Sequence, residues 1–153
     1  MNHMVVRYAH TNLVARDWRA LAQFYCDVFG CIPVPPERDF HGEAFDRLTG
    51  LEQARLRGIH LRLPGWGDDG PTLEIFQYAP SEHSTVGAIN RQGLGHLAFL
   101  VTDVHAMRVA VLNAGGGTIG DVVTLPVASG QLVTVCYARD PEGNAIELQS
   151  WSD

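Results

Sequence analysis

The chain has 153 residues, of which 46% are hydrophobic and 18% charged, and its formal net charge is -6 at pH 7. This composition is typical of a globular protein with one core or two small halves, and the acidic balance without a Lys/Arg run argues against a nucleic-acid partner. No apolar stretch approaches the ~20 residues of a membrane helix and no signal peptide is evident, so we expect a cytoplasmic protein without a membrane partner.

The first predicted elements are a strand over residues 5–15 and a helix that follows it. Asp17 stands where a side-chain oxygen caps the first free amides of a helix, and Gly30 stands where a helix ends in the left-handed conformation. Between them apolar residues recur at helical spacing, at Trp18, Leu21, Ala22, Tyr25, Val28 and Phe29. Three β-like runs follow, at residues 32–34, 58–63 and 72–78.

The same order of elements recurs in the second half of the chain. Residues 97–101 form a predicted strand, Asp103 caps a helix, and the glycines at 115–117 end it. Three further strands are predicted at residues 118–125, 132–138 and 144–149, with a turn at 140–144 where Pro and Gly suit the required φ angles. The three cysteines show no metal-type pairing, and we interpret them as buried thiols.

Each half therefore reads as a βαβββ module, and the fold class is α+β. We place the first module at residues 4–79, a linker rich in Ser, Gly and Asn at 80–92, and the second module at 93–151, together forming one domain. The first module is the longer one, and we assign its extra residues to 40–57, where a short helix is expected.

A pair of His and Glu residues occurs at matching places in the two modules. His10 precedes Asp17 by seven positions, His96 precedes Asp103 by seven, and each half closes on a Glu between two aliphatic residues, Glu74 and Glu147. Strand alternation directs all four side chains to the sheet face opposite the helix of their own module. If the two sheets curve toward each other, the four side chains enter one cavity.

Two carboxylates facing two imidazoles are costly to desolvate unless a cation or a tight salt-bridge network compensates them. We favour the cation, and predict that His10, Glu74, His96 and Glu147 bind one divalent metal ion. Mixed imidazole and carboxylate ligands suit Ni, Co, Zn, Mn or Fe without selecting one of them. His41, His60, His83 and His105 have no partner in the repeat, and we interpret them as surface or loop residues.

Three stretches carry a family resemblance over almost the whole chain: residues 10–17, 93–99 and 139–147. They resemble the vicinal oxygen chelate superfamily, which includes glyoxalase I, methylmalonyl-CoA epimerase, extradiol dioxygenases and bleomycin resistance proteins. The resemblance implies tandem βαβββ modules that form a cupped mixed sheet around a metal site, in a homodimer. Glu74 favours the glyoxalase I and epimerase branch, because extradiol enzymes use only the positions of His10, His96 and Glu147.

Three functions follow from this resemblance as hypotheses. The first is a metal-dependent lyase, isomerase or epimerase that abstracts a proton next to a carbonyl of a small oxo or thioester substrate. In this hypothesis Glu147 is the base, and Glu74 is the second ligand or the opposing acid-base group.

The second is an Fe(II) extradiol-type dioxygenase. Residues 137–143 resemble the end of the extradiol motif, but its upstream His is missing, and we interpret Tyr137 as a core residue. The third is a non-catalytic drug-binding resistance protein, which would not require the complete His and Glu set.

Overall fold

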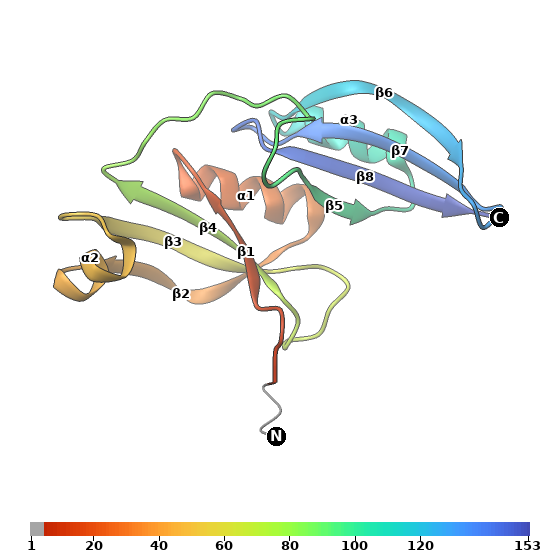
Figure 1. Ribbon diagram of the computed structural model, residues 1–153. Coiled ribbons are helices and arrows are strands. Elements are labelled where there is room, and N and C mark those ends of the chain that lie inside the picture. The colour runs from red at the N-terminus through yellow and green to blue at the C-terminus, as the bar shows by residue number, and fades with distance from the viewer. Residues whose placement is uncertain (1–4) are drawn as a thin grey trace. The chain divides into compact units, whose positions relative to one another are not determined.

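The computed structural model describes residues 5–153, so the predicted start of the first module at residue 4 lies outside it. The chain forms two compact units with their boundary between Glu82 and His83, and Figure 1 shows one sheet in each. No helix within residues 5–153 is long and apolar enough to cross a membrane.

The first unit contains four strands and two helices in the order β1 (His10–Val14), α1 (Trp18–Phe29), β2 (Ile32–His41), α2 (Glu43–Thr49), β3 (Arg55–Arg62) and β4 (Thr72–Ala79). The strand order in its sheet is β1-β4-β3-β2. β1 pairs with β4 in parallel, and the other two pairs are antiparallel.

The second unit repeats this arrangement without the extra helix, as β5 (Leu97–Leu100), α3 (Val104–Asn113), β6 (Gly117–Pro126), β7 (Leu132–Arg139) and β8 (Ala145–Ser152). Its sheet has the order β5-β8-β7-β6, again with one parallel pair, β5 with β8. The α+β class and the two tandem βαβββ modules with mixed sheets are therefore confirmed, and α2 is the short helix expected in the insertion.

Two strands of the first unit differ in length from the prediction. β1 begins at His10 rather than at residue 5, because its partner β4 begins at Thr72, which pairs with His10. β2 continues to His41, because the start of β3 at Arg55 gives its last residues a partner. The register shifts between Val34 and Arg38, where two prolines lacking an N–H fit an interrupted ladder.

The caps of α1 agree with the prediction. The Asp17 carboxylate accepts hydrogen bonds from the amides of Arg19 and Ala20, both at 3.1 Å. Gly30 ends the helix at φ 70°, a left-handed conformation that suits a residue without Cβ. In the second unit Asp103 caps α3 through the amide of Ala106, but the helix ends at Asn113, before the glycines.

Each helix packs on one face of its own sheet, and this packing decides to which face the glutamates point. α1 contacts β3 and β4, and α3 contacts β6, β7 and β8. The neighbours of the two glutamates are buried to 1% exposure or less, and they are Leu73, Ile75, Ile146 and Leu148. Because successive residues of a strand point to opposite faces, Glu74 and Glu147 lie on the faces away from the helices.

The cysteines are unpaired thiols, as interpreted from the sequence. Cys31 and Cys136 are buried and Cys26 is half-buried. Burial raises the pKa of Cys31 to about 12 and raises the pKa of Cys136. These thiols are protonated at neutral pH and act as small apolar side chains.

Candidate functional site

Glu74 lies at the centre of the candidate site in the first unit, on β4 between β1 and β3. The register pairs it with Asn12 on one side and with His60 on the other. His10 lies two residues before Asn12 on β1, on the same face. The sheet ladder therefore brings two imidazoles and an amide to one carboxylate.

Each oxygen of the Glu74 carboxylate faces one imidazole. His10 Nε2 lies 3.3 Å from Oε2, and His60 Nε2 lies 3.1 Å from Oε1. The two rings are edge to face, with their centroids 5.8 Å apart. One ligand atom from each of these three residues lies within 4.8 Å of the others, which makes them a group able to hold a metal ion.

Hydrogen bonds hold the carboxylate and one of the two rings in place. Asn12 Nδ2 donates to Glu74 Oε2 at 3.2 Å, and His60 Nδ1 lies 3.1 Å from the Thr72 hydroxyl. His60 Nε2 is thereby directed at the carboxylate. Glu74 is 7% exposed, so its charge is removed from most of the solvent that would stabilise it.

The electrostatic surroundings favour a neutral imidazole at His60. Burial is the largest influence and lowers the pKa of His60, and the charges of Arg38 and His10 lower it further. The negative charge of Glu74 opposes them and does not cancel the shift. The neutral ring is the form that binds metals, because a protonated imidazole has no free lone pair.

The second unit contains a related but different cluster. His96 Nε2 lies 3.3 Å from Glu147 Oε2, and the His96 ring packs against Tyr137 with centroids 5.1 Å apart. Tyr137 is paired with Glu147 in the register of β7 and β8. Burial raises the pKa of Tyr137, and the charge of Glu147 and a hydrogen bond to it raise the pKa further.

The registers of the two sheets show which residues correspond in the repeat. Glu74 pairs with Asn12 and His60, and Glu147 pairs with Ala98 and Tyr137. The first unit thus has a His where the second has a Tyr. It also has an amide donor where the second has a methyl group.

The structure brings together His10 with Glu74, and His96 with Glu147. The prediction that all four side chains bind one metal ion stays a prediction. The interpretation of His60 as a surface residue without a repeat partner is wrong: it lies in mid-strand on β3, against Glu74, and corresponds to Tyr137. The interpretation of Tyr137 as core is also wrong, because its half-buried ring contacts His96. His41, His83 and His105 are exposed, as expected.

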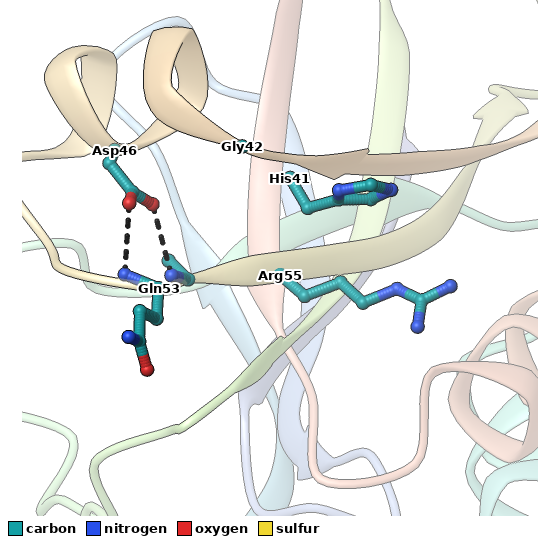
Figure 2. A pocket seen from close by; sticks show the side chains of 6 residues that line it. His41, Gly42, Asp46, Gln53 and Arg55 are labelled. Atoms are coloured by element: carbon teal, nitrogen blue, oxygen red, sulfur yellow. Dashed lines mark hydrogen bonds between the residues drawn. The ribbon is translucent and has the colours of Figure 1, made fainter.

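A separate cavity of about 410 Å³ lies at the other end of the first sheet, beside α2 (Figure 2). Its lining includes His41 and Asp46, but the Asp46 carboxylate is already bonded to the amides of Gln53 and Ala54, at 2.9 and 3.0 Å. Figure 2 shows these two bonds as dashed lines from the Asp46 carboxylate toward the segment that contains Gln53. This carboxylate therefore fastens the loop after α2.

The donors in the first unit fit a divalent ion. Imidazole nitrogens and a carboxylate oxygen are ligands shared by Zn, Ni, Co, Mn and Fe, and a hydrogen bond to the second nitrogen of a ring is usual for a metal-binding His. The hydrogen bond between His60 and Thr72 supplies this feature. In the second unit His96 and Glu147 give a His and carboxylate pair.

Comparison with known proteins identifies the family of this chain. The sequence model of the glyoxalase/bleomycin resistance protein/dioxygenase superfamily matches residues 7–148. The chain belongs to this superfamily. Within the glyoxalase superfamily, a glyoxalase family protein from Bacillus cereus has a similar structure, with a TM-score of 0.83, 19% identity, and coverage of 99% of this chain and 98% of that one.

Two further glyoxalase superfamily structures are similar over nearly the same span. A glyoxylase/bleomycin resistance protein/dioxygenase domain from Frankia sp. EAN1pec has a TM-score of 0.62 at 18% identity, covering 98% of this chain and 95% of that one. A glyoxalase/bleomycin resistance protein/dioxygenase from Alicyclobacillus acidocaldarius has a TM-score of 0.58 at 15% identity, covering 96% and 92%. At these identities the likeness shows the shared fold alone. No curated protein sequence matches the chain.

Proposed function

We propose that this protein is a divalent-metal-dependent enzyme that abstracts a proton next to a carbonyl group of a small oxo or thioester substrate, a lyase, isomerase or epimerase. The observation that carries the proposal is the buried carboxylate of Glu74 with an imidazole Nε2 on each of its oxygens, at 3.3 and 3.1 Å. Burial removes water from the Glu74 carboxylate, and a bound cation can compensate for the free energy lost with that hydration.

The proposed ligands are those of the doubled pattern, His10, Glu74, His96 and Glu147. A bound ion would act as a Lewis acid toward a substrate carbonyl, lowering the pKa of the adjacent C–H. In the pair His10 and Glu74, the carboxylate is oriented by Asn12, whose side-chain amide donates a hydrogen bond to it. That the two pairs serve one ion stays a prediction from the sequence.

Proton transfer is assigned to Glu147. The Tyr137 hydroxyl hydrogen-bonds to this carboxylate, and His96 Nε2 lies 3.3 Å from its Oε2. A carboxylate held by two side chains in a half-buried setting accepts a proton at a fixed position, which is what a general base requires. Glu74 is the second ligand or the opposing acid-base group.

An Fe(II) ring-cleaving oxygenase is the second candidate, and a specific observation favours it. Tyr137 contacts both His96 and Glu147, so a phenol hydroxyl is available as a proton donor beside two residues that correspond to extradiol ligands. Proton transfer is preferred, because an extradiol site does not use the carboxylate at the position of Glu74, which here is buried and bonded.

Metal analysis separates these functions. The protein is purified without chelators, and its bound metals are measured. The wild type is then incubated in D₂O with small 2-oxo compounds and with thioesters, and deuterium uptake at the α-carbon of each compound is measured. We expect one divalent ion per site and exchange that Glu147→Gln abolishes, whereas Glu82→Gln, at an exposed position, leaves it unchanged.

Other results would decide against proton transfer. Bound iron together with oxygen consumption on catechols identifies the oxygenase. Absence of any stoichiometric metal removes both enzyme functions and leaves a drug-binding protein. Exchange that survives Glu147→Gln places the base at another residue.

A further inference from the structure

We infer that His60 is a further protein ligand of the metal, so that the first module supplies three donors, His10, His60 and Glu74, from its own sheet. This inference rests on the proposed function, since it names a further ligand of the same metal. It goes beyond the doubled His and Glu pattern, which contains no counterpart of His60.

The position of His60 is fixed by main-chain pairing. It lies in the middle of β3, with five paired residues before it in the ladder with β4 and two after it. Its partner in that ladder is Glu74 itself. A side chain held in the centre of an antiparallel ladder keeps its direction, which a loop histidine would not.

The donor atoms have the spacing that a metal ion requires. Imidazole nitrogens and carboxylate oxygens bind zinc-like ions at about 2.0–2.2 Å, so two donors of one ion lie roughly 3–4 Å apart. His60 Nε2 lies 3.1 Å from Glu74 Oε1, and His10 Nε2 lies 3.3 Å from Oε2. Within this module both histidines present the same ring nitrogen, Nε2, to the carboxylate.

The remaining ring nitrogen of His60 is already occupied. Nδ1 lies 3.1 Å from the hydroxyl of Thr72, which is on β4, two residues before Glu74. A hydrogen bond from Nδ1 to that hydroxyl leaves a lone pair on Nε2, the nitrogen that faces Glu74. His60 has the supporting hydrogen bond that metal-binding histidines use.

The corresponding residue of the second module provides a natural replacement. Tyr137 occupies the position of His60 in the repeat, opposite Glu147. Tyr at this position is therefore compatible with the βαβββ sheet of the same chain. His60→Tyr removes the imidazole and keeps an aromatic ring that can hydrogen-bond the glutamate, so it complements the smaller change His60→Gln.

The test is Co²⁺ binding by the full chain after removal of bound metal, followed through the visible absorption of the ion. We expect one Co²⁺ at the site, and a dissociation constant raised more than ~100-fold in His60→Gln and in His60→Tyr, beyond the 10–100-fold typical of losing a supporting partner. His10→Gln should weaken binding to a similar extent. His41→Gln, at an exposed residue on β2, should stay within about threefold of the wild type.

The possible outcomes are distinct. Unchanged Co²⁺ affinity and spectrum in both folded His60 variants overturn the inference and leave the proposed metal function intact. Failure of the wild type to bind Co²⁺, Ni²⁺, Zn²⁺, Mn²⁺ or Fe²⁺ overturns the proposed function and the inference together. Circular dichroism of the metal-free variants checks that each has folded.

Discussion

Side chains from both neighbouring strands contact the carboxylate of Glu74. His10 and Asn12 approach one oxygen from β1, and His60 approaches the other from β3. In the second module the corresponding carboxylate, Glu147, is contacted by His96 and Tyr137. The first carboxylate thus has two imidazoles beside it, whereas the second has one imidazole and one phenol.

Another residue pair links α1 to β2 and is open to a direct test. Arg19 donates two hydrogen bonds to Glu37, at 2.7 and 2.9 Å, and these lower the pKa of the Glu37 carboxyl. We expect Arg19→Gln to raise this pKa toward its ordinary value, measured by NMR titration, with Arg47→Gln, whose guanidinium bonds Glu43 instead, as the control. An unchanged Glu37 pKa in Arg19→Gln would show that the pair does not form in solution.

The sign of the pH dependence follows from the direction of this shift. Because the pKa of Glu37 is lower in the folded chain, the pair contributes stability above the unfolded pKa, and that contribution is lost as the pH falls through the folded pKa. Both groups are solvent-exposed, so the effect on the free energy of unfolding should be small and should weaken further with added salt.

Among the helices and strands, features that depend on neighbouring residues were predicted correctly more often than features that depend on the pairing of distant strands. The caps at Asp17 and Gly30 and the apolar stripe between them are contained within a short stretch of sequence, and α1 forms as predicted. His60 was missed because its role depends on the register of β3 against β4, which are joined by a nine-residue loop. Alternation along β3 with buried Ile59 and Leu61 is the signal that could have placed His60 on the same face as Glu74.

The cap of α1 gives a prediction at this scale. Asp17→Ala removes the acceptor of two backbone hydrogen bonds and should lower the free energy of unfolding by about 1 kcal/mol, measured by urea denaturation. Asp17→Asn keeps an oxygen acceptor and should cost less. Equal losses in the two variants would assign the effect to the charge rather than to the hydrogen bonds.

For the whole molecule, the family and the tandem modules could be predicted because the His and Glu pattern repeats along the chain. Each half of the predicted set is seen as a contacting pair, His10 with Glu74 and His96 with Glu147. That the two pairs bind one ion together stays a prediction. Alternation along a strand shows on which face of its own sheet a side chain lies, but it does not show how the two sheets are placed.

Metal binding should appear in the stability of the whole chain. A ligand that binds only the folded state at 100 times its dissociation constant raises the free energy of unfolding by about 2.7 kcal/mol. We expect Co²⁺ to raise the melting temperature accordingly and a chelator to reverse the rise. Mg²⁺ serves as the control, because it disfavours imidazole ligands; an equal rise with Mg²⁺ would indicate nonspecific ionic stabilisation.

The buried thiols divide between the two units, Cys31 in the first and Cys136 in the second. A protonated and enclosed thiol does not react with an alkylating reagent until the structure around it opens. In a Cys26→Ser background, the labelling rates of these two cysteines would therefore time the opening of each module separately. Comparing the labelling rates of Cys31 and Cys136 with and without added metal would show which module the metal keeps closed.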